Sequence, residues 1–284
     1  MPINFDLLRR LCETPGVSGR EDQVRDLVIE ELRPLTDEIS VDTMGSVIAT
    51  KKGKGGPRVM LAAHTDEIGF LVKFVEDKGF LRVQPVGGWD PRTMVAQRVH
   101  VHGYGGQTLL GTLMPAAKPI HLLTADELNK PPKIEEFFVD LGLPTDQVRT
   151  LVEMGDMVTM ARTTERVGDM VVSKSLDDRL SVLIMIEALR AVGPHSAEII
   201  AVATTQEEVG LRGATTASLV VSFFAVFAAV NRQGSFRAFA LVDTLLLLQA
   251  LVAVTSTMGL LISTLVAAER RAEAARLLAH DALA

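Results

Sequence analysis

Apolar runs alternate with polar breaks over most of the chain, and their lengths predict both strands and helices. Residues 58–63 and 197–205 are mostly apolar, without strict polar alternation, which is typical of strands covered on both faces. Shorter runs at 39–41 and 46–51 flank a Met-Gly pair and indicate two neighbouring strands. Apolar residues at helical spacing predict helices at residues 4–14, 20–33 and 180–192. This mixture indicates an α/β domain.

The helix predicted at 20–33 carries start and stop signals. Ser18 is followed three residues later by Glu21, which is the spacing of a capping box. We therefore expect Ser18 to cap this helix and Pro34 to end it.

The segment from residue 68 to residue 160 has a different texture. Glycines and prolines separate short apolar runs, which predict strands at 70–75, 80–85, 98–102, 108–114 and 156–161, with one helix at 145–153. Strand and helix alternation resumes after this segment. The sequence therefore predicts a small, mostly β domain (68–160) inserted into a discontinuous α/β domain (1–67 and 161–217).

Charge and cysteine content exclude several classes of protein. The 284 residues carry a net charge of −6, so bulk charge gives no case for nucleic-acid binding. The single cysteine, Cys12, excludes an internal disulfide and fits a reducing compartment. The first ten residues lack the apolar stretch of a signal peptide. We therefore expect the α/β portion to be cytoplasmic.

Residues 218–284 differ in composition and predict a helical tail. Residues 244–268 contain no charged side chain. As a helix this segment would be about 37 Å long, enough to cross a bilayer core of about 30 Å. A buried core helix is the alternative, and for the shorter run at 219–230 both interpretations are open. Three arginines after residue 268 favour a cytoplasmic C-terminus, so the tail is expected to contact the cytoplasmic membrane and anchor the protein there.

Candidate chemistry lies where the apolar runs end. His64 and Asp66 follow one predicted strand, Glu207 and Glu208 follow another, and Asp177 lies in a loop between them. Open α/β sheets bind ligands at such carboxyl ends. Histidine and carboxylates suit zinc, cobalt or manganese. Asp66 could accept a hydrogen bond from His64, and Glu207 could act as a general base on metal-bound water.

Each of these residues also has a plain structural interpretation. A Glu-Glu pair is more often merely solvated, and a lone His such as His64 is more often structural than a ligand. Asp177 could simply cap the helix that follows it. The residues alone leave these alternatives open.

Four stretches taken together resemble the M42 metallopeptidases, which include glutamyl, deblocking and tetrahedral aminopeptidases. They are Ala63–Gly69 (AHTDEIG), Val86–Pro91 (VGGWDP), Leu176–Arg179 (LDDR) and Gln206–Ala214 (QEEVGLRGA). Their order and spacing match over roughly residues 1–217. The resemblance implies a zinc-peptidase α/β/α sandwich, here truncated, with an inserted β-barrel-like domain through which copies of the chain could associate.

The same resemblance implies two divalent metal ions and release of N-terminal residues from peptides. His64, Asp177 and Glu208 would be metal ligands, with Asp177 bridging, and Glu207 the catalytic base beside Asp66. The family pattern also has an aspartate about two dozen residues past the glutamates and a histidine about a hundred residues past them. Val230-Asn231 stands near the first position, and the chain ends before the second. Activity is therefore expected to be impaired.

The tail resembles the last membrane helices of bacterial MASE1-type sensor domains. Three functions follow as hypotheses. The chain is a dinuclear metal aminopeptidase, or a membrane-tethered inactive module that binds peptides, or a chimeric product without an evolved function.

Overall fold

The computed structural model describes residues 3–116, 118, 120–124 and 130–217. These residues belong to one compact unit, Met1–Leu219. None of its described helices is long and apolar enough to cross a membrane. The spans predicted at 219–230 and 244–268 lie outside the described residues.

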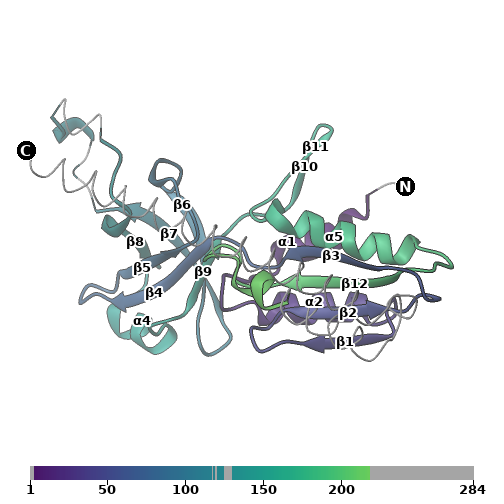
Figure 1. Ribbon diagram of the computed structural model, residues 1–284. Helices are drawn as coiled ribbons and strands as arrows, with labels where there is room; N and C mark the ends of the chain where they lie inside the picture. The colour runs from purple at the N-terminus through teal and green to yellow at the C-terminus, as the bar shows by residue number, and fades with distance from the viewer. Residues whose placement is uncertain (1–2, 117, 119, 125–129, 218–284) are drawn as a thin grey trace, which may run out of the picture. The chain divides into compact units, whose positions relative to one another are not determined.

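A four-stranded sheet forms the α/β part (Figure 1). Its order is β1 (Glu38–Val41), β2 (Val47–Lys51), β12 (Glu198–Thr204) and β3 (Arg58–His64). β12 runs parallel to β3 and antiparallel to β2. Because β3 and β12 are parallel, their carboxyl ends lie at the same edge, with Thr204 opposite His64. All four strands were expected from the apolar runs.

Three helices bury their apolar sides in one core with this sheet. They are α1 (Phe5–Glu13), α2 (Asp22–Leu32) and α5 (Leu176–Ala191). The core takes its buried side chains from these helices and from β2, β3 and β12. In α5 the first turn is irregular, because Asp177 and Asp178 have non-helical backbone angles. The regular helix therefore begins after Asp178, close to the predicted start.

The predicted capping box at α2 is wrong. The helix starts at Asp22, Glu21 occupies the cap position, and no side chain caps the first turn. Ser18 instead donates a hydrogen bond to Asp66, and Glu21 accepts one from the amide of Gln206. The local spacing fits a cap, but both side chains instead bind partners far away in the sequence.

Six strands between Gly69 and Met160 close into a barrel. Around the barrel they follow the order β4 (Gly69–Val75), β5 (Leu81–Val86), β8 (Phe137–Asp140), β7 (Thr108–Pro115), β6 (Gln97–His102) and β9 (Met157–Met160). Closure leaves the barrel without an unpaired edge. It has its own apolar core, and α4 (Thr145–Leu151) packs against it through Val148 and Leu151.

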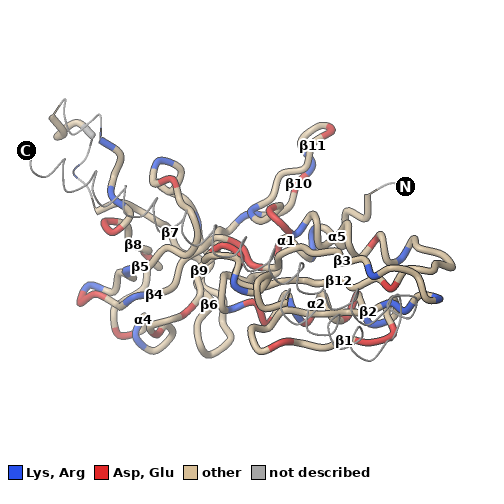
Figure 2. The backbone as a smooth tube through the Cα atoms, viewed as in Figure 1, with Lys and Arg blue, Asp and Glu red and all other residues tan. Residues whose placement is uncertain are grey.

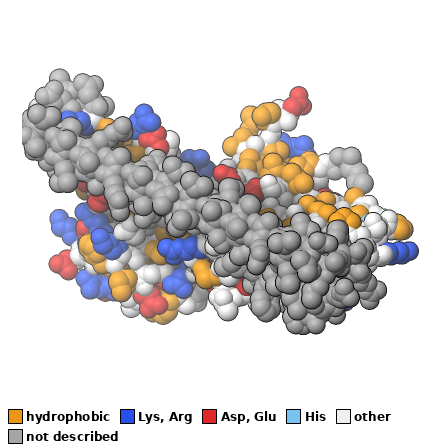
Figure 3. Space-filling view, in the orientation of Figure 1, with side chains coloured by type: hydrophobic (Ala, Val, Ile, Leu, Met, Phe, Trp, Pro, Cys, Tyr) orange, Lys and Arg blue, Asp and Glu red, His pale blue; other side chains and the backbone are white. Residues whose placement is uncertain are grey.

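The sequence analysis missed one strand of the barrel and a hairpin that follows the barrel in the chain. β8 has only four residues, and the hairpin of β10 (Glu165–Val167) and β11 (Met170–Val172) has three in each strand. Runs this short carry little periodicity. The hairpin exposes Val167, Met170 and Val172, and hydrophobic side chains gather there in Figure 3. The domain boundaries at 67/68 and 160/161 stay a prediction, since residues 1–219 form one compact unit.

Acidic and basic residues alternate along the backbone of the described elements (Figure 2), and neither sign forms a long continuous run. Some of the few buried charges lie at the edge of the sheet where β3 and β12 end: Asp66, Glu67 and Arg179 are all nearly inaccessible. Burying a charged group is costly unless the group is paired. The buried charges therefore mark this edge of the sheet as a candidate functional site.

Candidate metal centre

The ends of β3 and β12 are held together by hydrogen bonds around Thr204. The amide and the hydroxyl of Thr65 each donate to the carbonyl oxygen of Thr204 at 2.8 Å. His64 therefore lies beside the start of the segment that carries Glu207 and Glu208.

Three successive amides in that segment bind buried carboxylates. The amide of Gln206 donates to Glu21 Oε1 at 3.0 Å. The amides of Glu207 and Glu208 donate to the two oxygens of Asp66, each at 3.0 Å. Gln206 has a left-handed backbone with φ of 55°. These bonds fix the turn, so the two glutamate side chains leave it in defined directions.

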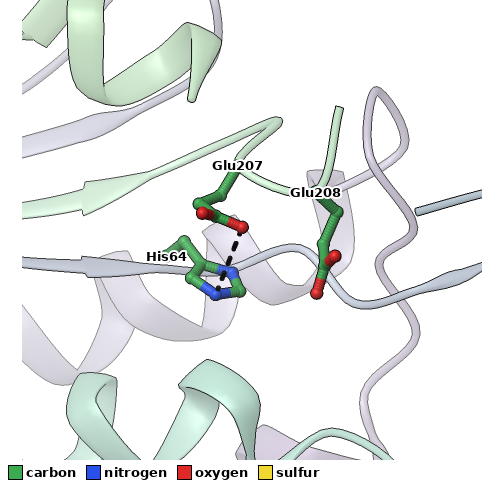
Figure 4. Close-up of side chains that lie close together, drawn as sticks. All are labelled: His64, Glu207 and Glu208. Atoms are coloured by element: carbon green, nitrogen blue, oxygen red, sulfur yellow. Dashed lines mark ion pairs between the residues drawn. The ribbon is translucent and has the colours of Figure 1, made fainter. Parts of the chain in front are cut away.

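His64, Glu207 and Glu208 converge at this edge (Figure 4). One ligand atom from each lies within 4.8 Å of the others, and His64 Nε2 is 3.8 Å from Glu207 Oε2. Among the described residues this is the one group of three or more His, Cys, Asp or Glu side chains with such spacing. The sheet thus brings together groups 143 and 144 positions apart in the sequence.

Asp66 orients the ring of His64. The Nδ1 atom lies 3.1 Å from the backbone oxygen of Asp66 and 3.4 Å from its carboxylate Oδ1. A proton on Nδ1 is therefore favoured, and Nε2 faces the carboxylates, where a metal ion would take the place of its proton.

Asp177 also lies close to Nε2 of His64. Its Oδ1 lies 3.3 Å from His64 Nε2, although its side chain is 88% exposed. The neighbouring Asp178 accepts a hydrogen bond from the backbone amide of His64 at 3.3 Å. The irregular first turn of α5 therefore places both aspartates against the end of β3.

The carboxylates determine the electrostatics of the site. Burial alone would lower the pKa of His64, but the hydrogen bond and charge of Asp66 outweigh it. With the added charges of Glu207 and Asp178, the pKa rises to about 9. Burial, and then the charge of Glu207, raise the pKa of Glu208.

The donor set fits a divalent transition-metal ion. One imidazole nitrogen and several carboxylate oxygens are ligands that zinc, cobalt and manganese accept. The raised pKa of His64 shows that the carboxylates attract positive charge to this point. His64, Glu207 and Glu208 have the spacing that could hold such an ion, and Asp177 adds a carboxylate beside His64 Nε2.

Comparison with known proteins identifies the family. The family model for M42 glutamyl aminopeptidases matches residues 45–231. The chain belongs to the M42 family. It is 36% identical over 219 residues to the putative aminopeptidase FrvX of Escherichia coli K12, which covers 76% of this chain and 61% of the relative.

Solved M42-type structures share the fold. An aminopeptidase from the archaeon Desulfurococcus kamchatkensis matches with a TM-score of 0.71 at 38% identity, over 76% of this chain and 60% of that one. The TET1 peptidase of Pyrococcus horikoshii matches with a TM-score of 0.67 at 30% identity, over 75% and 64%. The expected α/β peptidase fold is therefore confirmed. The chain spans less than two thirds of each of these relatives.

Within this M42 chain, sequence reasoning missed the side chains that support the candidate site. Ser18 and Glu21 hold Asp66 and the Glu207 turn, and the buried pair of Glu67 and Lys174 lies beside them. Glu67 stands inside the stretch Ala63–Gly69, and Lys174 stands two residues before the stretch Leu176–Arg179. The signal that could have located this pair is a charged residue within a stretch of residues expected to be buried.

Proposed function

We propose that this chain is a metal-dependent aminopeptidase that releases N-terminal residues from peptides. The observation that carries the proposal is the convergence of His64, Glu207 and Glu208 at the shared end of β3 and β12. Membership of the M42 family supports the same reaction class.

We propose a division of roles between the candidate ligands, of which the geometry supports the contact of His64 with Asp177 and the grouping of His64, Glu207 and Glu208. His64 Nε2 and Asp177 Oδ1, 3.3 Å apart, would hold one ion, and Asp177 with Glu208 would hold the second. Bound zinc or cobalt, with manganese as a further candidate, would supply Lewis acidity and an activated water. Glu207 would accept the proton of that water, and Asp66 would keep the imidazole of His64 in the ligating orientation.

The charge of the site favours substrates with a free amino terminus. The ions would neutralise Asp177 and Glu208, and Glu207 would keep a negative charge beside them, to which an ammonium group is attracted. Binding by the amino end would place the first peptide bond, rather than an internal one, beside Glu207.

We expect the activity of this chain alone to be weak. The described residues offer two protein ligands for each ion, whereas catalytic zinc usually has three. The sequence near Val230-Asn231 holds no acid that could add a third. Weak occupancy of the site would then limit turnover.

The test is hydrolysis of amino-acid p-nitroanilides by the full chain, purified in detergent with added zinc or cobalt. A low rate that falls a further ~10²–10⁴-fold in Glu207→Gln would support both the site and the base. A rate unchanged in Glu207→Gln would overturn the role of Glu207. Bound metal without any hydrolysis would favour an inactive peptide-binding module instead.

Association of several copies through the barrel is a second proposal. The TET1 peptidase of Pyrococcus horikoshii assembles into a tetrahedron or an octahedral shell. Light scattering on the full chain, and on a variant with the barrel surface altered at exposed Leu110 and Phe74, tests it. A monomer in the wild-type chain would contradict this proposal.

A further inference from the structure

Asp177 is an exposed carboxylate on a segment that is otherwise anchored in the interior. Its own side chain is 88% exposed, yet Ser175 and Arg179 on either side are almost completely buried. Such a residue is not held by its own packing. Its position relative to His64 must come from the anchors of the segment between Ser173 and Arg179.

The first anchor is an ion pair between Lys174 and Glu67. Lys174 Nζ lies 2.5 and 2.6 Å from the two carboxylate oxygens of Glu67. The two side chains are 3% and 1% exposed. Glu67 stands three residues after His64, and Lys174 stands three residues before Asp177. The pair therefore joins the two segments that carry the candidate ligands, and each member is three sequence positions from its ligand.

Glu67 is itself fixed on its other side. Gly16 donates its amide to Glu67 Oε1 at 3.2 Å and accepts the amide of Glu67 at 2.9 Å. Glu67 cannot follow Lys174 if the segment shifts, because its backbone is bound to the loop before α2. Lys174 is thus held against a rigid carboxylate.

Further anchors hold the segment against the end of α1. Ser175 donates its hydroxyl to the carbonyl oxygen of Cys12 at 2.7 Å. Arg179 donates to the carbonyl oxygens of Leu11 and Thr14 at 2.5 and 3.1 Å. These bonds fix the segment to a helix, while the ion pair ties it to the strand segment that carries His64, together with the hydrogen bond from the His64 amide to Asp178.

A buried ion pair is weak evidence for stability. The cost of removing two charges from water commonly exceeds their attraction, and apolar replacements of whole pairs are often neutral or stabilising. The position of this pair, between the two segments that carry His64 and Asp177, suggests a geometric role. Precise placement of ligands is what such supports provide.

We propose that Lys174 is a positioning residue, which acts through Glu67 to hold Asp177 at ligand distance from His64. This inference rests on the proposed function, because it concerns the metal that Asp177 would bind. It goes beyond that function in assigning a role to two residues that touch neither substrate nor ion.

Metal affinity and stability separate this role from a purely structural one. In the full chain, Lys174→Met should lower both, because Glu67 is left buried and unpaired. The double variant Glu67→Gln with Lys174→Met removes both charges, so its metal-free unfolding midpoint should recover toward wild type. Its affinity for zinc or cobalt, measured by calorimetry, should stay roughly 10–100-fold weaker. Wild-type affinity in the double variant would overturn the proposal.

A double-mutant cycle with Asp177 tests the pathway of the effect. If Lys174 acts through Asp177, then Lys174→Met should add little further loss of affinity in an Asp177→Asn background. Fully additive losses would contradict the proposal. Lys51→Met is the matched control, since Lys51 donates to the carbonyl oxygen of Leu189 and lies opposite Ile199, near the start of β12, away from the site. It should bind metal as wild type does.

Failure of this inference is distinguishable from failure of the proposed function. If the wild-type chain binds neither zinc nor cobalt, the proposed function is wrong and the positioning role falls with it. If the wild-type chain binds metal and the Lys174 variants bind equally well, only the positioning role is overturned.

Discussion

Ser18 donates its hydroxyl hydrogen to Asp66, with 2.6 Å between Ser18 Oγ and Asp66 Oδ2. Asp66 is fully buried and carries the amides of Glu207 and Glu208 on the same carboxylate. Burial opposes its charge, but the hydrogen bonds that it accepts, those of His64 and Ser18 foremost, lower its pKa. A residue near the N-terminus therefore helps to keep this central carboxylate ionised.

Removing that hydroxyl should destabilise the fold. Ser18→Ala leaves a buried carboxylate short of one donor, which costs about 1–3 kcal/mol in the free energy of unfolding. Urea unfolding measures it. Ser196→Ala, at an exposed position, is the control and should change stability by less than about 0.5 kcal/mol. If the two substitutions changed the free energy of unfolding equally, the hydrogen bond from Ser18 to Asp66 would not contribute to stability.

Gly87 approaches Glu208 so closely that a side chain there should disturb the site. It has φ of 82°, and an added Cβ would overlap Ile68 and lie 3.2 Å from Glu208 Oε2. Gly87→Ala should therefore lower both stability and metal affinity, as seen by thermal unfolding with and without zinc. Gly88→Ala is the matched control, because nothing lies within 4 Å of its added Cβ. A Gly87→Ala variant that binds zinc normally would contradict the close approach.

Zinc should raise the stability of the full chain. A ligand that binds only the folded state at 100 times its Kd adds about 2.7 kcal/mol to the free energy of unfolding. Chelation should reverse the gain, and His64→Asn should remove most of it. His195→Asn, in the loop before β12 and away from the site, should keep it. A gain that survives His64→Asn would place the metal elsewhere.

His102 should make the stability of the barrel depend on pH. Burial, and then the charges of His100 and Lys174, lower the pKa of His102 to about 4. Between pH 6.5 and 4 the unfolded chain therefore binds a proton that the folded chain excludes. Stability should fall as pH falls through this range, by up to about 1.4 kcal/mol per pH unit from this residue. In His102→Gln the urea unfolding profile should be flatter; parallel profiles would refute the assignment.

Parts of the fold that depend on long apolar runs were predictable from sequence. β12 is covered as its apolar run predicted, whereas β3 lies at the edge of the described sheet and exposes Arg58, Val59 and Ala62, so the prediction of a covered strand was wrong there. Both strands were nevertheless predicted, and the polar residues at their ends include His64, Glu207 and Glu208. The roles of these residues remain proposals. Ser18 shows the limit of local signals: its spacing to Glu21 fits a helix cap, but a buried carboxylate 48 residues away takes the hydroxyl instead.

Other elements left too little trace in the sequence. β8 and the β10–β11 hairpin are too short for a period to be read, and their pairing is decided by neighbours in space. Lys174 stands between two serines, and nothing in this local sequence shows that its partner lies 107 residues earlier. Long-range pairing is the information that a single sequence hides.

The closed barrel lies between the two halves of the candidate site in the sequence, and this has a consequence for the order of folding. His64 and Asp177 are 113 residues apart, and β3 can pair with β12 only after the intervening barrel segment has been brought between them. Contacts of such long range form slowly, because the chain must first be brought together. We therefore expect the ligands to assemble late, after the folding transition state. A metal ion that binds there should leave the folding rate nearly unchanged and slow unfolding instead. The ion would then stabilise the folded chain without helping to nucleate its folding.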